Sequence, residues 1–445
     1  MKKLTKQGWK GFRSGWGSFS KLFLLRRTAQ APLRVELVFC CWLLASNCWL
    51  TLTAGAQQPV VNADHSVTFT VKVPGAKKMV LVLSKEKYKM ERQGDTFTYH
   101  TASLPSEMYT YYYLSKGKQM LDPENSRVTR DIGMKLNFFF VEGDVADYYL
   151  DKDVPHGKID KVWYPSTLNG MSQRRMFVYT PPGYDSEGED TYPVLYLLHG
   201  SGGDETSWAD YGRACQILDN MIHQDSIQPM IVVMPNGNIE LDAAPGESPY
   251  MSKEPTGNNI SSWLGKYEKL FVHEIVQYTE KHYRVKADKQ HRAIAGLSMG
   301  GLHTLFIALN NPDMFDCVGL FSAQTSNMLN IGNIYKMERF NHNIQRFRNA
   351  IALMTDKVAR PITLSDRIGD IDIYNHLEDK LHRQFEHAPR LYYIAIGRDD
   401  FLKKMNREYR AILDKHGYPY TFVESDGDHS WKNWRRYLVD FIKRM

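Results

Sequence analysis

The sequence predicts two domains of different class, a small all-β sandwich over residues 57–145 followed by a doubly wound α/β domain with a mostly parallel sheet over residues 164–445. Three observations predict this arrangement. Apolar residues alternate with a period of two in the first part, and continuous apolar runs alternate with helix-length segments in the second. A charged segment, 146–163, reads as a linker between them. The length of 445 residues and the hydrophobic content of 43% suit two domains with buried cores.

A basic and apolar leader precedes the first domain. Residues 1–56 begin with many Lys and Arg, continue with an apolar stretch over 35–52 and end on Ala54-Gly55-Ala56. These are the three parts of a secretory signal, so we expect a secreted or periplasmic protein that is cleaved after Ala56 and has no membrane span afterwards. A membrane anchor is the alternative, but polar residues interrupt the apolar stretch. Lipoprotein attachment at Cys48 is a second alternative, which fits poorly because Asn47 stands where a small residue is required.

The positive charge of the chain belongs to this leader. The net charge is +6, yet residues 1–56 hold nine Lys or Arg and one acid, which leaves 47 basic and 49 acidic residues in the rest. A mature chain with that balance has no basic surplus for nucleic acid, so we exclude a nucleic-acid partner.

Two cysteines remain after the leader, Cys215 and Cys317. Both lie in apolar surroundings, and a single pair in a long chain gives no disulfide framework. We expect two buried free thiols.

The first domain has the pattern of short antiparallel strands. Residues Ser66–Val73 alternate without a fault, and turn residues such as Pro74-Gly75 separate them from later short runs. Those runs are Met79–Leu83, Thr96–Thr101 and Tyr109–Leu114. Strands at this spacing are typical of an immunoglobulin-like sandwich. Tyrosines in the last run invite a glycan-binding interpretation, but alternation directs at least half of them into the core.

The second domain has the pattern of strands that are covered on both faces. Its continuous apolar runs are Val194–Leu198, Met230–Met234, Ala293–Ala295, Val318–Phe321 and Leu391–Ile396. Helix-length segments such as Leu270–Tyr283 and Leu402–Asp414 lie between or after them, which predicts the doubly wound sheet. The long polar stretch 323–389 is either an insertion that covers the site or two ordinary surface helices with loops.

The pentapeptide Gly296-Leu297-Ser298-Met299-Gly300 follows one of these apolar runs and precedes a helix-like stretch. A serine on a tight turn between a strand and a helix is the nucleophile elbow, in which small neighbours let the chain turn sharply. The pattern alone also fits an ordinary glycine-rich turn. Its sequence context favours the nucleophile, because partners follow in the required order.

Those partners are an acid and a histidine. Two carboxylates, Asp399 and Asp400, follow the Leu391–Ile396 run, and His429 follows a further strand-like run. His429 would take the proton of Ser298 and later deliver it to the leaving alcohol, and the acid would hold the imidazole in the right tautomer. Position alone leaves the choice between the two aspartates open.

The oxyanion of such a reaction needs two backbone N–H donors. One is expected from Met299, directly after the serine. The other is expected from Gly200 or Ser201, in the run His199-Gly200-Ser201-Gly202-Gly203 that follows the first strand of the α/β domain. A tight turn without a ligand is the alternative.

Four motifs in this order resemble those of the esterase D-like carbohydrate esterases of family 1, which include feruloyl and acetylxylan esterases. They are His199 to Trp208, Gly296 to Gly301, Gly397 to Leu402 and Gly427 to Trp431, and the resemblance spans about residues 155–445. It implies an α/β-hydrolase fold, Asp400 as the acid, secretion, and action on acyl groups of plant cell-wall polysaccharide such as xylan. The first domain resembles the carbohydrate-binding-like N-terminal modules of glycogen-branching enzymes.

Aromatic residues near the motifs are candidates for substrate contact. Trp208, Trp263 and Trp431 could stack on a sugar or a phenolic ring, although each fits a core position equally well.

The preferred hypothesis is a secreted serine esterase that removes feruloyl or acetyl groups from an acylated polysaccharide or oligosaccharide. Acyl transfer or thioester hydrolysis on the same machinery is one alternative, and a glycan-binding protein with a non-catalytic hydrolase domain is another. No cluster of His, Cys and Asp has the spacing of a metal site, and the chemistry needs no cofactor.

Overall fold

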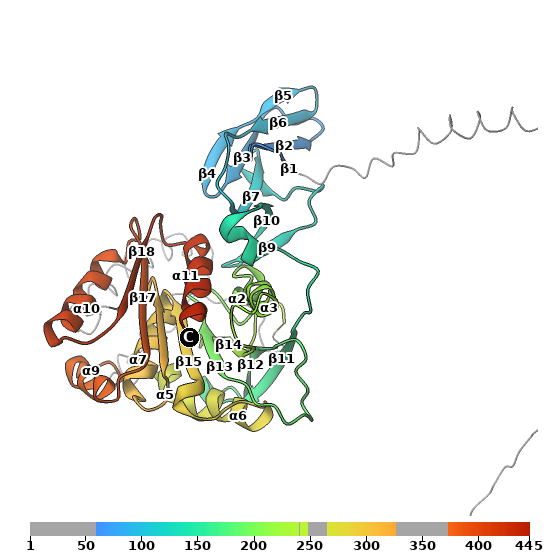
Figure 1. Cartoon of the computed structure of the whole chain (residues 1–445). Coiled ribbons are helices and arrows are strands. Elements are labelled where there is room, and N and C mark those ends of the chain that lie inside the picture. The colour runs from blue at the N-terminus through green and yellow to red at the C-terminus, as the bar shows by residue number, and fades with distance from the viewer. Residues whose placement is uncertain (1–58, 240, 248–264, 326–372) are drawn as a thin grey trace, which may run out of the picture. The chain divides into compact units, whose positions relative to one another are not determined.

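The computed structural model describes residues 59–239, 241–247, 265–325 and 373–445 (Figure 1). The predicted signal sequence with Ala56 and Cys48, the candidate Trp263 and most of the 323–389 stretch lie outside the described residues. All described residues belong to the unit 57–445.

Residues 59–141 form the two antiparallel sheets of a β-sandwich, which we call the front module. One sheet has the strand order β1-β2-β6-β5 and the other β4-β3-β7-β10-β9, with β8 paired to β7. The strands are β1 (Val60–Val61), β2 (Val67–Lys72), β3 (Met79–Leu83), β4 (Glu86–Lys89), β5 (Glu91–Gln93), β6 (Thr96–His100), β7 (Glu107–Ser115), β8 (Lys118–Met120), β9 (Val128–Asp131) and β10 (Met134–Val141). Phe69, Tyr111 and Phe139 meet in the core between the sheets, with ring centroids 5.0 to 5.9 Å apart. The two antiparallel sheets are consistent with the predicted sandwich, and Tyr111 and Tyr113 are buried in its core, as alternation predicts.

The α/β domain is built on one eight-stranded sheet of order β11-β12-β14-β13-β15-β16-β17-β18. Its strands are β11 (Lys158–Pro165), β12 (Gln173–Thr180), β13 (Val194–Leu198), β14 (Ile231–Pro235), β15 (Arg292–Leu297), β16 (Cys317–Phe321), β17 (Leu391–Gly397) and β18 (Thr421–Ser425). All neighbouring pairs from β14 to β18 are parallel, whereas the β11–β12 and β12–β14 pairs are antiparallel, so β12 alone runs against the other strands. The predicted mostly parallel α/β-hydrolase sheet is confirmed.

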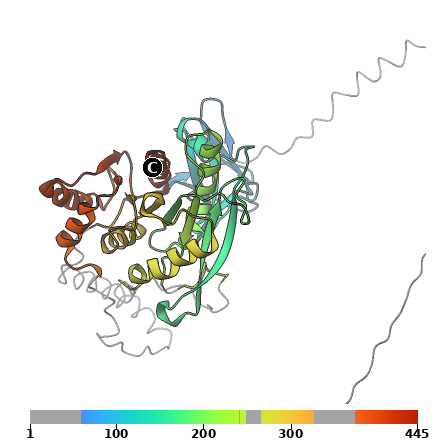
Figure 2. The ribbon, with the colours of Figure 1, turned by 60° about the horizontal axis from the view of Figure 1, so that its bottom comes forward.

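Helices cover both faces of this sheet (Figures 1 and 2). Alternate residues of one strand serve opposite faces: Leu195 and Leu197 pack with one set of helices, and Val194 and Tyr196 with the other. The first set is α2 (Ser207–Asp210), α3 (Ala214–His223) and α11 (Trp431–Arg444). The second set is α5 (Lys266–Phe271), the short π-helix η3 (Val272–Val276), α6 (Gln277–His282), α7 (Met299–Asn310), α9 (Leu377–Glu386) and α10 (Lys403–His416). Short 3₁₀ turns occur at η1 (Asp144–Tyr148), η2 (Leu168–Gly170) and η4 (Lys289–His291).

The segment predicted as a linker over 146–163 is partly regular structure. It overlaps η1 and contains most of β11, which pairs with β12 along its full length. The sequence pattern does not predict this strand, because β11 lies at the edge of the sheet and its first four residues are exposed. Only strands that are buried on both faces carry a continuous apolar run.

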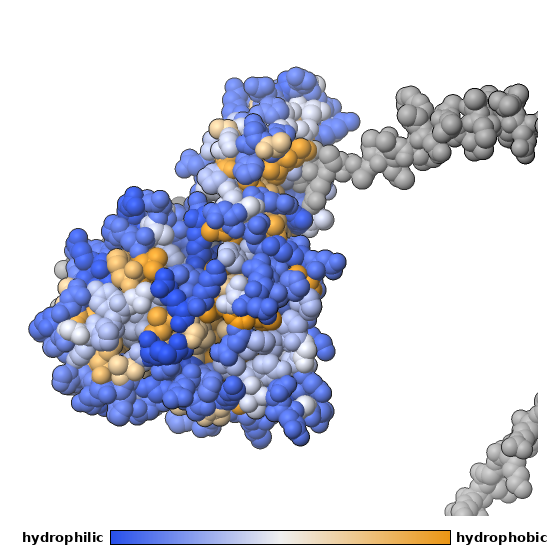
Figure 3. Space-filling model, viewed as in Figure 1, coloured by the Kyte–Doolittle hydropathy of each residue, from blue (hydrophilic) through white to orange (hydrophobic). Residues whose placement is uncertain are grey.

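The surface seen in Figure 3 is mainly hydrophilic, with hydrophobic residues in separate patches. Cys215 and Cys317 are both buried and unpaired, as expected. Within the described ranges no helix is long and apolar enough to span a bilayer.

A buried ion pair joins the front module to the α/β domain. Glu107 of β7 accepts hydrogen bonds from Arg435 of α11 at 3.1 Å, from Arg436 at 3.1 Å and from the Tyr149 hydroxyl at 2.7 Å. Glu107 and Arg435 are each only 1% exposed. A charge pair at this depth is costly to break, because the remaining partner stays buried without a counter-charge.

Replacing Glu107 with Gln should lower the free energy of unfolding by about 3 kcal/mol, because Arg435 loses its buried counter-charge. Urea unfolding followed by circular dichroism measures this loss. Glu91→Gln, on the exposed strand β5, is the matched control and should stay within about 0.5 kcal/mol of the wild type. A loss below about 1 kcal/mol for the Glu107 variant would contradict the argument.

Candidate active site

Ser298 stands on a strained turn between β15 and α7. Its φ is 53° and its ψ is −114°, a region that non-glycine residues rarely adopt and that costs about 1–3 kcal/mol. Hydrogen bonds hold the turn: the Ser298 N–H donates to the Phe321 carbonyl at 3.0 Å, and the Ser298 carbonyl accepts from Leu302 and Gln324. The surrounding backbone therefore fixes the strained geometry predicted for an elbow.

Two glycines allow the turn to be this tight. A Cβ added at Gly300 would clash with the carbonyl oxygen of His199, and one added at Gly296 would clash with the carbonyl oxygen of Gly300. The elbow and the segment after β13 therefore approach each other backbone to backbone. Only residues without a side chain fit at these two positions.

Asp400 and His429 are hydrogen-bonded to each other. Asp400 follows β17, is 4% exposed, and its two carboxylate oxygens lie 2.9 and 3.1 Å from His429 Nδ1. Because a carboxylate only accepts, Nδ1 carries the proton and Nε2 is left to accept one. Asp399 is exposed. The structure thus brings Asp400, and not its neighbour, to the histidine.

Ser298 and His429 line one cavity of about 630 Å³. The proposed oxyanion donors Gly200, Ser201 and Met299 line it as well. The remaining lining residues are Lys85, Arg130, Asp131, Ile132, Gly133, Gly202, Gly203, Asp204, Ser207, Tyr211, Gly237, Asn238, Ile239, Leu241, Pro245, Leu297, Phe401, Ser430, Trp431 and Trp434. The cavity therefore contains the predicted serine, histidine and backbone donors together.

The segment His199–Gly203, which we call the oxyanion loop, lies directly against the serine. A Cβ added at Gly200 would be 3.2 Å from the Ser298 Cβ. His199 secures the loop from beneath: its Nε2 accepts from the Gly237 N–H at 2.8 Å, so its Nδ1 bears the proton and donates to the Gly200 carbonyl at 2.8 Å. Burial lowers the pKa of His199 from 6.5 to about 4, which keeps the ring neutral in this role.

The candidate tryptophans have different positions. Trp431 lines the cavity, and Trp263 lies outside the described residues. Trp208 is 1% exposed, packs edge-on against Trp431 and donates from Nε1 to the Leu198 carbonyl at 3.0 Å. The predicted substrate contact of Trp208 is therefore corrected to a packing role, because its polar edge is satisfied inside the core.

Several cavity residues were not found from the sequence. Phe401 and Trp434 flank the His429 ring, with centroids 4.5 and 4.9 Å away. The position of Phe401, directly after Asp400, was an available signal. Lys85 and Ile132 come from the front module, and nothing in the motifs of the α/β domain points to them.

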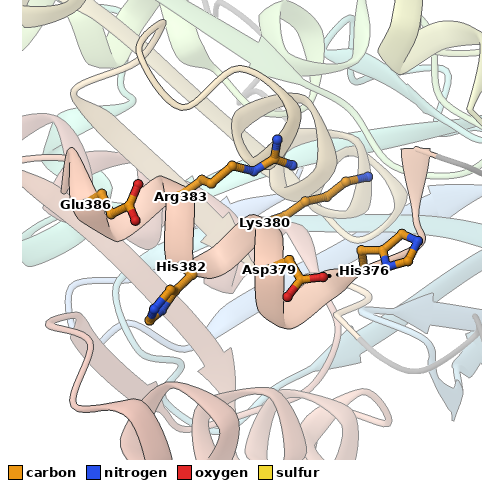
Figure 4. Close-up of a pocket in the computed structure, with 6 residues that line it drawn as sticks. All are labelled: His376, Asp379, Lys380, His382, Arg383 and Glu386. Atoms are coloured by element: carbon orange, nitrogen blue, oxygen red, sulfur yellow. Dashed lines mark ion pairs between the residues drawn. The ribbon is translucent and has the colours of Figure 1, made fainter.

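A second hollow lies on the surface of α9 (Figure 4). Its lining side chains all come from this helix and the residue before it: His376, Asp379, Lys380, His382, Arg383 and Glu386. The His376–Asp379 ion pair, at 3.6 Å, is largely exposed to solvent. None of these residues lines the cavity at Ser298, so the hollow adds nothing to that site.

Among the residues that the structure describes, no group of three or more His, Cys, Asp or Glu could hold a metal ion.

A strand, a strained serine and a helix, with an acid and a histidine at the ends of later strands, define the α/β-hydrolase class. The chain belongs to the Esterase family, described as "Putative esterase", whose model matches residues 169–445.

Named relatives are similar to this domain. An endo-1,4-beta-xylanase/feruloyl esterase of Xylanibacter ruminicola is 33% identical over 286 residues, which are 61% of this chain and 37% of that protein. An acetyl esterase of Caldicellulosiruptor saccharolyticus is 27% identical over 262 residues, 59% of this chain and 85% of that protein. The chain thus spans little more than a third of the first relative and most of the second.

An enterobactin esterase from Shigella flexneri has a similar structure, with a TM-score of 0.57 and 14% identity over 85% of this chain and 92% of that one. At that identity the likeness concerns the fold alone. It extends into the front module, because residues 158–445 are only about two thirds of the chain.

Replacing Asp400 with Asn should reduce kcat for an aryl ester about 10³- to 10⁴-fold, because an amide no longer holds the imidazole in the tautomer that accepts at Nε2. Initial rates of 4-nitrophenyl acetate hydrolysis measure it. Asp399→Asn, one residue away and exposed, is the control and should keep kcat within about threefold of the wild type. Equal losses in the two variants would contradict the assignment of Asp400.

The lowered pKa of His199 predicts a pH dependence of stability. Below pH 6.5 the His199 ring binds a proton in the unfolded chain, whereas the buried ring of the folded protein stays neutral down to about pH 4. The free energy of unfolding should therefore fall by up to about 3 kcal/mol as the pH drops from 6.5 to 4. Urea unfolding at several pH values measures the slope. His199→Gln keeps one hydrogen-bond donor and one acceptor but cannot titrate, so the fall in the free energy of unfolding that is due to His199 should vanish in this variant. His65→Gln, at an exposed site, is the control and should show the same fall as the wild type. Parallel pH profiles for wild type and His199→Gln would refute the prediction.

Proposed function

We propose that this chain is a secreted serine carboxylic-ester hydrolase that removes feruloyl or acetyl groups from plant cell-wall polysaccharide such as xylan. One observation carries the proposal. Ser298 stands on a strained elbow in the cavity that also contains His429, and the Nδ1–H of His429 is shared by the two carboxylate oxygens of the buried Asp400. That arrangement suits nucleophilic attack on an ester carbonyl.

In the first half of the reaction, Ser298 Oγ attacks the carbonyl carbon while His429 Nε2 takes the hydroxyl proton. Negative charge develops on the former carbonyl oxygen, where the N–H groups of Met299 and of Gly200 or Ser201 are the proposed donors. Each such donor is worth about 3 kcal/mol of barrier. The bond to the alcohol oxygen then breaks, and His429 gives its proton to that oxygen.

In the second half, water takes the place of the alcohol. His429 removes a proton from the water as it attacks the acyl-Ser298 ester, a second oxyanion forms, and its collapse releases the carboxylic acid. The serine regains its proton from His429. Asp400 remains ionised throughout and stabilises the imidazolium that forms in each half.

The substrate class rests on the relatives and on the chemistry of the cavity. One relative is named for feruloyl ester hydrolysis together with xylanase activity, and another for acetyl ester hydrolysis. The cavity combines aromatic rings of Phe401, Trp431 and Trp434 with polar groups at its front-module side. Aromatic faces and a few hydrogen-bonding groups suit a phenolic acyl group and a sugar.

Export belongs to the same proposal. Residues 1–56 have the composition of a signal sequence, and an acylated polysaccharide is an extracellular substrate. The domain limits 57–145 and 164–445, with a carbohydrate-binding-like front module, also remain part of the proposal.

Replacing Ser298 with Ala should lower the rate of methyl ferulate or aryl acetate hydrolysis by about 10⁴-fold or more, because no nucleophile remains. A fluorophosphonate probe followed by mass spectrometry should label the wild type at Ser298 and leave the variant unlabelled. Ser103→Ala, at an exposed position of the front module, is the control for handling and expression. Retained activity in the Ser298 variant would sink the proposed mechanism.

The substrate class is tested by comparing methyl ferulate, acetylated xylan and a short thioester with the wild-type enzyme. Activity on either of the first two supports the proposal. Turnover of the thioester alone would overturn the cell-wall substrate.

A further inference from the structure

The front module reaches the active-site cavity through two hairpin turns. One is Ser84-Lys85, between β3 and β4, and the other is Ile132-Gly133, between β9 and β10. Lys85, Ile132 and Gly133 line the same cavity as the serine and histidine of the α/β domain. A module that only bound glycan on its own surface would not need turns that line the cavity of Ser298 and His429.

The Ile132-Gly133 turn has a β-branched residue at a position of positive φ, where such residues are rarely found. Both of its central residues have positive φ, 45° at Ile132 and 82° at Gly133, as in the two-residue turns that favour Asn-Gly or Asp-Gly. A β-branched residue at positive φ is an outlier, and such conflicts between sequence and local structure concentrate at functional sites. Burial does not explain the isoleucine, since its side chain is 67% exposed.

Exposed apolar side chains concentrate at this cavity. Among the described residues, the two most exposed large hydrophobic side chains are Phe401, at 73%, and Ile132, at 67%, and both line it. They come from different domains. Apolar groups left open on two sides of one cavity are suited to bind a ligand between them.

Each turn also contacts a loop that carries part of the catalytic machinery. Ile132 lies against the oxyanion loop, because a Cβ added at Gly202 would be 2.6 Å from the Ile132 Cγ2. Lys85 Nζ donates to Asp428, the residue before His429, at 2.9 Å. The neighbouring Asp131 accepts from Trp431 Nε1 at 3.4 Å. The buried Glu107–Arg435 pair anchors the module, so these positions are held together.

The mechanism tells which part of the substrate these turns face. His429 must give its proton to the leaving alcohol, so the alcohol portion of the ester lies beside the loop that Lys85 contacts and the start of α11 that Asp131 contacts. Charged hydrogen-bonding groups next to the Trp431 and Phe401 rings match a saccharide, which has polar hydroxyl edges and apolar faces. The apolar residues Ile239 and Leu241 suit the acyl group.

We propose that the turns Ser84-Lys85 and Ile132-Gly133 form a subsite for the saccharide alcohol of the ester, so that the front module determines specificity inside the active site. This inference rests on the proposed ester hydrolysis. The module then acts by holding the sugar next to His429, and removing a contact should penalise sugar esters more than simple alkyl esters of the same acid.

The test compares two substrates that share an acyl group and differ in the alcohol. We would measure kcat/KM for a feruloylated arabinoxylan oligosaccharide and for methyl ferulate, or for the acetyl pair if that is the acyl group accepted. In Ile132→Asn the ratio of kcat/KM for the sugar ester to kcat/KM for the simple alkyl ester should fall at least tenfold. Asparagine suits the turn, so the melting temperature should hold or rise. Ile132→Gly is a second variant that the turn accepts, and Lys85→Met should lower the same ratio.

Lys116→Asn is the matched control. Lys116 is also the first residue of a two-residue turn before glycine, with φ of 50°, but it is exposed and does not line the cavity. Its ratio should equal that of the wild type. If the ratio of kcat/KM for the sugar ester to kcat/KM for the methyl ester stays within twofold of the wild type in the Ile132 and Lys85 variants, the inference is overturned. It is also overturned if kcat/KM falls equally for both substrates and the melting temperature is lower. A wild type without activity on either ester would instead overturn the proposed function.

Discussion

The close approach of two backbones organises this protein's site. The oxyanion loop after β13 and the start of α7 meet where Gly300 faces the His199 carbonyl, and any side chain at Gly300 would separate them. Because β13 and β15 are adjacent parallel strands, their carboxyl ends bring the loop and the elbow to one edge of the sheet. The buried, neutral His199 then ties the loop to Gly237. The strain at Ser298 persists because these contacts fix it from several sides.

The same edge collects contributions from elements far apart in the sequence. Asp400 follows β17 and His429 follows β18, both parallel neighbours further along the sheet. The front module adds two turns from the other side of the cavity and is anchored by the buried Glu107–Arg435 pair. A rigid attachment of this kind lets side chains from a separate module keep a fixed position in the active site.

Much of the α/β domain could be predicted because fully buried strands leave a continuous apolar signal. The predicted strand Val194–Leu198 coincides with β13. The exposed edge strand β11 lacks that signal, so the sequence pattern predicts a linker there. Trp208 and Trp434 show the same limit at the site: the sequence gives no indication of which tryptophan faces a cavity, because both are apolar residues on helices next to motifs.

Local pattern and chain order are enough to predict the classes of the two domains, the elbow serine, and the acid and histidine that follow it in order. The remaining features of the site depend on how the chain packs. Burial and hydrogen bonding single out Asp400, which the family resemblance implies and chain order alone does not. Packing also places Trp208 in the core and brings Ile132 and Lys85 into the cavity. These features depend on the distances in space between segments that lie up to hundreds of residues apart in the sequence. Such distances are set by the packing of the whole chain and cannot be predicted from a local sequence pattern.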